Sequence, residues 1–183
     1  MFIDNMPDKR HKEYFKASQR ICLSCLFFMF LSFVGLLPIS CTSIDCPLNN
    51  RVYANYKLAG DVTVLTDTLN ISTTKVTGID SVLINNDVGI DSFILPMSYR
   101  GMEDIFYIHI KGKNGTATLD TLKVRKLDHT HFESVDCKPS FFHTITGVEY
   151  THYRIDSVVI KSANVTYDVS KPHFYIYFKN TGN

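Results

Sequence analysis

Residues 105–126 have the sequence IFYIHIKGKNGTATLDTLKVRK, and this stretch decides the fold class. Apolar and polar side chains alternate over 105–111 and again over 116–126, which is the period-two pattern of a β-strand with one buried face. A short polar segment with two glycines, GKNG at 112–115, separates the two runs. This spacing predicts a β-hairpin.

The same alternation recurs along the chain after residue 41. Further runs cover residues 52–58, 62–65, 69–72, 81–84, 93–95, 132–135, 141–148, 153–161 and 174–178. No stretch there keeps the i, i+3, i+4, i+7 pattern of an amphipathic helix. Short strands joined by turn residues are typical of antiparallel sheets. We therefore expect an all-β domain over residues 51–183, an antiparallel β-sandwich of immunoglobulin-like architecture, preceded by an N-terminal hydrophobic helix.

The first forty residues differ in composition from the rest. Residues 21–40 carry no charged side chain, whereas residues 1–20 are rich in basic ones. The basic side chains are Lys9, Arg10, Lys12, Lys16 and Arg20. A positive segment, an apolar run and small residues before a cleavage point form the pattern of a secretory signal peptide. We expect residues 1–40 to be such a signal, with a basic region at 1–20 and an apolar region at 21–40.

Residues 37–41, LPISC, resemble the lipobox of bacterial lipoproteins, in which a small residue precedes a cysteine that takes a diacylglycerol. Ser40 and Cys41 fit this pattern, whereas Pro38 replaces the usual aliphatic residue. The resemblance implies lipidation at Cys41 and a lipidated tether over residues 41–50.

An uncleaved anchor is the alternative, because about 20 apolar residues suffice to span a bilayer. A helix at 21–40 would then hold a periplasmic domain on the inner membrane. Gly35 and Pro38 interrupt the end of a continuous helix and so favour cleavage.

The five cysteines are consistent with an exported chain. Cys22 and Cys25 lie in the apolar run and are lost on cleavage. Lipidation uses Cys41, which leaves Cys46 and Cys137. Disulfides persist in oxidising compartments, so we predict a bond between these two, with a pair of buried free thiols as the alternative. Closing a loop of about 90 residues would stabilise the domain by about 3–5 kcal/mol in the chain-entropy model.

Several short motifs follow one another after residue 45. They are CPLNN at 46–50, the aromatic pair Tyr53 and Tyr56, DSVLIN at 80–85, LPM at 95–97, FESVDC at 132–137 and IDSV at 155–158. This order resembles a family of uncharacterised Bacteroidota lipoproteins that is defined as a domain of unknown function. The resemblance implies a place in the cell envelope, a β-sandwich and a paired Cys46 and Cys137. It implies no reaction.

One segment, DHTHFE at 128–133, concentrates the side chains that bind metal ions. On a strand, His129, His131 and Glu133 would project from one face, because they are spaced two apart. Two imidazoles and a carboxylate suit zinc or a similar ion. A fourth ligand would come from His109, His143, His152 or His173. The alternative is the solvated face of an ordinary strand.

Four Asp-Ser/Thr-aliphatic triplets match a pattern at which exported Bacteroidota proteins are O-glycosylated. Their hydroxyl residues are Thr68, Ser81, Thr121 and Ser157. The alternative is structural, because Asp, Ser and Thr side chains bond nearby backbone groups and so mark the starts of strands.

Charge and motifs argue against several function classes. Residues 41–183 carry 14 basic and 15 acidic side chains, so no field attracts nucleic acid. A basic patch at Lys123, Arg125 and Lys126 is interpreted as a solvated sheet edge. The sequence has no G-x-S-x-G, no H-E-x-x-H, no phosphate-binding glycine loop and no dinucleotide fingerprint.

We therefore expect a non-enzymatic binding or structural module without a cofactor. It would be lipid-anchored in the cell envelope, on the periplasmic or surface side of the outer membrane, with an envelope protein or a glycan as its partner. The second hypothesis is a metal-binding domain that uses His129, His131 and Glu133.

Overall fold

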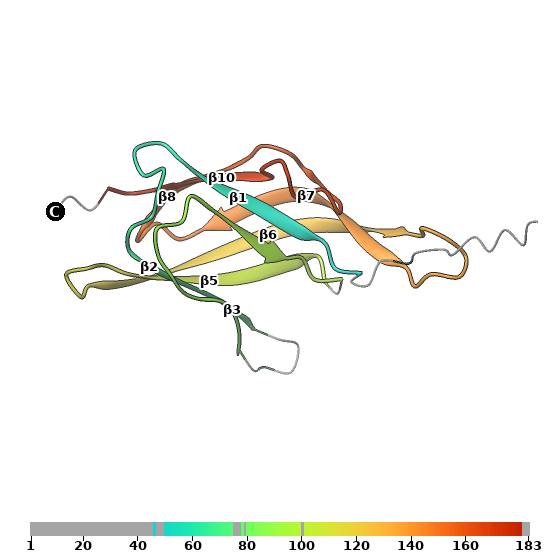
Figure 1. Ribbon diagram of the computed structural model, residues 1–183, viewed down its shortest axis with the longest axis horizontal. Helices are drawn as coiled ribbons and strands as arrows, with labels where there is room; N and C mark the ends of the chain where they lie inside the picture. The colour runs from blue at the N-terminus through green and yellow to red at the C-terminus, as the bar shows by residue number, and fades with distance from the viewer. Residues whose placement is uncertain (1–45, 47–49, 75–77, 79, 100, 181–183) are drawn as a thin grey trace, which may run out of the picture. The chain divides into compact units, whose positions relative to one another are not determined.

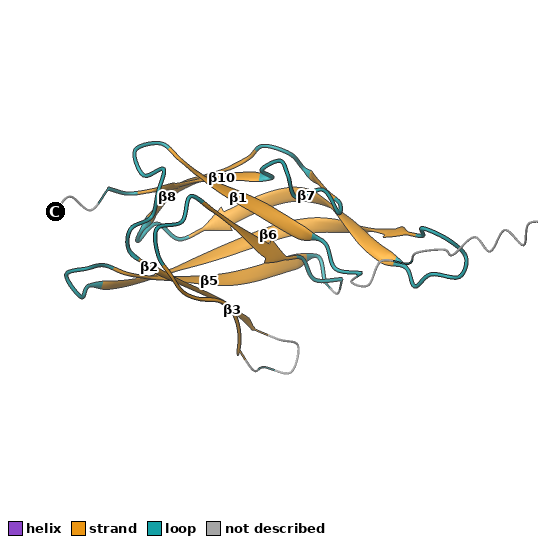
Figure 2. Ribbon diagram, in the orientation of Figure 1, coloured by secondary structure: helices purple, strands orange, loops and turns teal. Residues whose placement is uncertain are grey.

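The computed structural model describes residue 46 and residues 50–74, 78, 80–99 and 101–180. The expected signal peptide and Cys41 lie outside these residues. The described part is all-β, and Figure 2 shows strands joined by loops, with no helix among them. None of the described residues belongs to a helix long and apolar enough to cross a membrane.

The described strands form two sheets (Figure 1). One sheet has four strands in the order β4-β1-β10-β8, and the other has six in the order β3-β2-β5-β6-β7-β9. The strands are β1 Tyr53–Ala59, β2 Thr68–Thr74, β3 Asp80–Asp87, β4 Ser92–Pro96, β5 Glu103–Lys111, β6 Ala117–His131, β7 Ser140–Tyr150, β8 Ile155–Ile160, β9 Asn164–Val165 and β10 Phe174–Phe178.

One strand pair departs from the expected antiparallel arrangement. β1 and β10 pair in parallel, with Tyr56 opposite Phe174. The two strands lie near opposite ends of the domain sequence, so no tight turn sets their relative direction. Antiparallel pairing is confirmed for the other described pairs, which include every hairpin.

Both sheets contribute to one hydrophobic core. Tyr56 of β1 is fully buried, and its ring stacks on Phe93 of β4 and Phe174 of β10 at centroid distances of 5.1 and 4.6 Å. Phe106 of β5 and Leu122 of β6 join the same cluster from the six-stranded sheet. Aromatic pairs of this kind contribute about 0.5–1.5 kcal/mol each beyond the area that they bury. The inward positions of the alternating runs are therefore the core positions.

The predicted hairpin of residues 105–126 is confirmed. β5 pairs with β6 in antiparallel register along its whole length. The Gly112 N–H closes the turn by donating to Thr116 O at 2.8 Å. Gly115 has a φ of 86°, a left-handed conformation that glycine adopts without steric cost.

Two of the expected strands do not form. Residues 62–65 belong to the β1–β2 connection, where Leu65 makes an isolated bridge with Ile90. Residues 132–135 belong to the β6–β7 connection, because β6 ends at His131. An alternating run becomes a strand when a neighbouring strand pairs with its backbone, and the local sequence does not specify that neighbour.

β6 runs along the six-stranded sheet between two opposite ends of the domain (Figure 1). The pocket end consists of the β5–β6 turn at 112–116 and the connections at 60–67 and 151–154. The disulfide end consists of the β4–β5 connection at 97–102 and the β6–β7 connection at 132–139.

Candidate functional site

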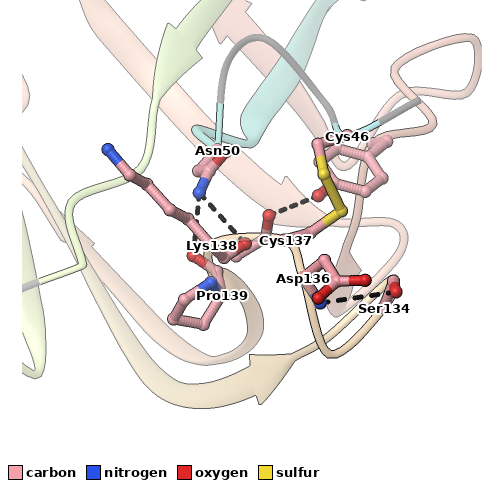
Figure 3. The surroundings of a disulfide bond; sticks show 9 residues. Cys46, Asn50, Ser134, Asp136, Cys137, Lys138 and Pro139 are labelled. Carbon is pink, nitrogen blue, oxygen red and sulfur yellow. Dashed lines mark hydrogen bonds between the residues drawn. A yellow bond between two sulfur atoms is a disulfide. The ribbon is translucent and has the colours of Figure 1, made fainter. Parts of the chain in front are cut away.

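A disulfide ties the start of the domain to the β6–β7 connection (Figure 3). Cys46 and Cys137 are bonded across a sequence separation of 91, with a Cα–Cα distance of 5.4 Å. Asn50 adds to the link, because its Nδ2 donates to Lys138 O at 3.2 Å and to Pro139 O at 3.0 Å. The structure thus contains the predicted cysteine pair. A loop of this size corresponds to about 4–5 kcal/mol in the chain-entropy model.

The pocket end holds a polar pocket of about 430 Å³. Its polar lining consists of Asp61, Thr66, Asp67, Lys113, Asn114, Thr116, Thr118, Arg154 and Asn180. The buried side chains Leu65 and Ile110 supply an apolar part of the lining. The volume falls within the range of about 300–1,000 Å³ that is usual for small-molecule sites. Hydroxyl, amide and charged groups here offer both hydrogen-bond donors and acceptors to a ligand.

A buried ion pair forms the charged wall of this pocket. Arg154 Nη2 lies 2.7 Å from Asp67 Oδ2, and the two side chains are 7% and 14% exposed. Arg154 belongs to the β7–β8 connection, and Asp67 immediately precedes β2. The pair therefore joins two connections that are far apart in sequence. Breaking such a pair is costly, because it leaves one buried charge without compensation.

Asp120 of β6 holds the β7–β8 connection in place. Its carboxylate is fully buried and accepts hydrogen bonds from the backbone N–H groups of Tyr153, Arg154 and Ile155 at 2.8, 2.6 and 2.9 Å. The Thr151 hydroxyl donates a fourth bond at 2.7 Å. This carboxylate thereby positions Arg154 at the pocket. Asp120 lies within β6 and not at its start, so the structural alternative, in which the triplet marks the start of a strand, does not hold at this triplet.

The three predicted metal ligands are only partly brought together. His131 Nε2 lies 3.0 Å from Glu133 Oε1, and the His131 ring stacks on Phe142 at 4.3 Å. His129 Nε2 instead lies 2.9 Å from Thr144 Oγ1. Across the described residues, no group of three or more His, Cys, Asp or Glu side chains is arranged to hold a metal ion.

The histidines considered as a fourth ligand have other neighbours. His143 Nδ1 lies 2.8 Å from Asp128 Oδ1, and its side chain is buried. His173 Nδ1 accepts the backbone N–H of Asn55 at 3.0 Å. His152 Nδ1 lies 3.2 Å from the carbonyl oxygen of Asp156. Each of these three imidazoles therefore has a polar neighbour of its own.

A buried lysine is the main feature at the disulfide end that the sequence did not reveal. Lys126 is 1% exposed. Its ammonium group donates to Ser98 O at 2.6 Å, to Gly101 O at 3.0 Å and to Asp128 Oδ1 at 2.7 Å. Lys126 therefore fastens the β4–β5 connection to β6. Its interpretation as part of a solvated basic edge is wrong, because the alternation of β6 carries it inward after Val124.

Burial and hydrogen bonds together shift the pKa values of the groups around Lys126. Burial would raise the pKa of Asp128, but the hydrogen bonds from Lys126 and His143 outweigh it and lower that pKa below its ordinary value. Burial lowers the pKa of His143, against the hydrogen bond to Asp128. Burial raises the pKa of Asp104, although Ser98 donates to its carboxylate. The cluster is thus a charged network that the fold partly desolvates.

The four candidate glycosylation residues lie at half-buried positions. They are Thr68 of β2, Ser81 of β3, Thr121 of β6 and Ser157 of β8. The aspartates that precede Ser81 and Ser157 are exposed. By contrast, Asp67 is paired with Arg154, and Asp120 is fully buried. The triplets therefore differ in how much of their side-chain surface a modifying enzyme can reach.

The chain matches the model of a known family. The family of unknown function DUF6452 matches residues 68–178. The chain belongs to this family. The DUF6452 match begins at the first residue of β2 and ends at the last residue of β10.

The DUF6452 match includes some of the features described above and leaves out others. Asp120, Lys126, Arg154 and Cys137 lie within the matched residues, whereas β1 and Cys46 lie outside them. The expectation of a domain of unknown function is confirmed. No curated protein and no solved structure matches the chain.

Proposed function

We propose that this protein is an exported lipoprotein of the cell envelope, related to the Bacteroidota family named above, whose domain is a non-enzymatic binding module. The observation that carries the proposal is the Cys46–Cys137 disulfide. Disulfides are stable in oxidising compartments outside the cytoplasm. The bond begins five residues after Cys41, the residue at which the sequence pattern places the lipid.

The arrangement of the strands supports a β-sandwich of immunoglobulin-like architecture. Two mainly antiparallel sheets bury their inward side chains in one shared core. Sandwich domains of this type place variable connections at their ends, where ligands bind. The polar pocket lies at such an end.

The pocket chemistry supports a glycan as the ligand. Asp67 and Arg154 compensate each other, and the charges of Asp61 and Lys113 are also opposite, so the lining has no formal net charge. A neutral ligand rich in hydroxyl groups matches this mixture of donors and acceptors. Val62 and Val64 also line the pocket and are more exposed than Leu65 and Ile110, so their aliphatic surface suits the apolar C–H faces of a sugar ring.

The anchor is tested by lipid labelling in a bacterial host that processes lipoproteins. We expect the full chain to incorporate labelled fatty acid and to fractionate with membranes. The Cys41→Ser variant should incorporate none, and Cys25→Ser is the matched control that should label normally. Equal labelling of Cys41→Ser and the unmodified chain would contradict the proposal.

The pocket is tested by titrating the protein with a panel of neutral mono- and oligosaccharides and following amide NMR signals. We expect shifts that cluster at Thr66, Asn114 and Asn180. The Asn180→Ala variant should weaken binding about tenfold, corresponding to the loss of about 1.4 kcal/mol. Asn85→Ala, on exposed β3, is the control that should not change binding. Shifts confined to residues outside the pocket would contradict this assignment.

A further inference from the structure

The β6–β7 connection, residues 132–139, exposes two apolar side chains that the core does not use. Phe132 is 60% exposed and Val135 is 97% exposed. The neighbouring β4–β5 connection exposes Met102 as well. Isolated apolar side chains are common on protein surfaces, and Val64 and Tyr153 are exposed at the pocket end. Phe132 and Val135 differ from these in lying on the connection that holds the disulfide. Phe132 and Val135 are therefore free to contact a surface outside the domain.

The disulfide joins this connection to Cys46, which is close in sequence to the proposed lipid attachment point. Cys137 lies within the connection, and its bond to Cys46 brings that residue to the same place. Only five residues separate Cys46 from Cys41. An extended chain spans about 3.3–3.6 Å per residue, so a lipid on Cys41 lies within about 18 Å of Cys46. This step rests on the proposed lipid anchor.

We propose that the β6–β7 connection inserts Phe132 and Val135 into the interface of the bilayer that carries the anchor. Apolar side chains that enter a membrane interface penetrate about 5–10 Å, to the boundary between headgroups and acyl chains. The short tether holds the connection against that surface. The domain then stands on its disulfide end and directs its pocket end away from the bilayer.

The charges of the connection determine whether anionic lipids attract it. Residues 132–139 contain Glu133 and Asp136 against Lys138, so the segment has no excess of positive charge. Attraction to anionic lipids therefore does not drive the contact. The contact depends on Phe132 and Val135, and it forms on zwitterionic phosphatidylcholine as well as on anionic lipid.

This orientation sets the distance between the pocket and the bilayer. β6 has 15 residues and connects the two ends of the domain. At about 3.3 Å per residue it spans about 45 Å. The pocket is thereby held at roughly that distance from the bilayer, where it meets soluble or surface-exposed ligands and not lipid.

The absence of tryptophan from the sequence allows a direct test. The full chain is purified with its anchor and reconstituted in phosphatidylcholine vesicles whose acyl chains carry bromine, a quencher of tryptophan fluorescence. Phe132→Trp and Val135→Trp report on the connection. Val64→Trp is the matched control, because Val64 is 47% exposed at the pocket end.

We expect a blue-shifted emission and strong quenching by brominated lipid for Phe132→Trp and Val135→Trp. Neither change should occur for Val64→Trp, and high salt should not reverse the quenching. Thermal unfolding of each variant in detergent confirms that the fold is retained. Val135→Trp is the safer of the two variants, because its side chain has few protein contacts to lose.

Flotation of the same vesicles separates failure of this inference from failure of the anchor. A chain that floats but gives no quenching at position 132 or 135 overturns the inference and leaves the anchor intact. A blue shift without quenching shows that protein, not lipid, covers the connection, and this also overturns it. A chain that does not float contradicts both the anchor and the inference.

Discussion

Different interactions stabilise the two ends of the domain. At the disulfide end, a covalent bond and the hydrogen bonds of Asn50 fix the β6–β7 connection, whose tip is otherwise exposed. At the pocket end, the fully buried Asp120 carboxylate and the Asp67–Arg154 pair order the β7–β8 connection. The order of the β6–β7 connection therefore depends on oxidation, and that of the β7–β8 connection on buried charge.

This difference suits the two proposed roles. An end that meets a membrane needs a firm link to its tether and exposed apolar side chains. An end that binds a polar ligand needs fixed donors and acceptors, which buried charges provide when their hydrogen bonds are complete. Each end can therefore be weakened separately by changing its own contacts.

Replacing Asp120 should have the largest effect. Asp120→Ala leaves three backbone N–H groups, two of them buried, and one hydroxyl without their acceptor. At about 1–3 kcal/mol for each unsatisfied group, partly offset by water entry, we expect a loss of about 4–6 kcal/mol. Urea-induced unfolding measures this loss. Asp156→Ala, at an exposed position, is the control and should change stability by no more than about 0.5 kcal/mol.

Two further outcomes would define the role of Asp120 more closely. In hydrogen exchange, the N–H groups of Tyr153 and Ile155 should lose protection well before those around Cys137. A loss below about 1 kcal/mol for Asp120→Ala would mean that water replaces the carboxylate without cost, and the account of the pocket end would be wrong.

Removing the disulfide should have the second largest effect. The double variant Cys46→Ser, Cys137→Ser should lose about 4–5 kcal/mol, because the unfolded chain regains the freedom of a long loop. The unmodified protein should lose a similar amount when reductant is added. The double variant itself should not respond to reductant. Exchange should accelerate at residues 132–139 and leave the Asp120 contacts protected, and equal acceleration at both ends would show that the ends are not independent.

Mild acid should destabilise the disulfide end through His143. Burial lowers the pKa of His143 in the folded state, so the unfolded chain binds the proton at a higher pH. The stability that this group contributes is fully present above its ordinary pKa of about 6.5 and is lost as pH falls through the lower folded pKa. Unfolding free energies at about pH 7.5 and about pH 5 should therefore differ, with the lower value in acid.

His143→Gln should reduce this acid sensitivity. His173 keeps part of it, because burial lowers the pKa of that imidazole too. Asp128 adds to the loss only at lower pH, since its folded pKa lies below its ordinary value. An unmodified protein that is equally stable or more stable at the lower pH would contradict the assignment.

Glycosylation should have the smallest effect on stability. In a host that modifies Asp-Ser/Thr-aliphatic triplets, we expect sugar on Ser81 and Ser157, whose preceding aspartates are exposed. Thr68 and Thr121 should stay unmodified, because Asp67 and Asp120 are engaged in buried contacts. Peptide mass spectrometry distinguishes the four sites. Equal occupancy at Thr121 would show that the modifying enzyme acts before the domain folds.

Local pattern predicted most of the fold. The hairpin of 105–126 and the buried positions of β1 and β10 follow from alternation, because a strand with one buried face repeats every two residues. The segments 62–65 and 132–135 share that alternation, yet they are connections. Whether such a segment becomes a strand depends on a neighbour that is distant in sequence, and so does the parallel pairing of β1 with β10.

The candidate site was predictable only in part. The cysteine pair was predicted by counting, because the expected cleavage and lipidation would leave two cysteines. The burial of Asp120 and Lys126 was not predicted, because the same residue types on a strand usually face solvent. One signal was available: the inward positions of β6 continue from Asp120 through Leu122 and Val124 to Lys126, which indicates that both charged side chains are buried. The pocket depends on three connections that only the tertiary structure brings together.

The most direct test of the central claim is the intact mass of the protein, produced in a host that processes lipoproteins and measured before and after reduction. The account predicts a chain that begins at Cys41, carries the added mass of its acyl groups, and gains two hydrogens on reduction. The mass of the full unprocessed chain, unchanged by reduction, would contradict both the lipid anchor and the disulfide.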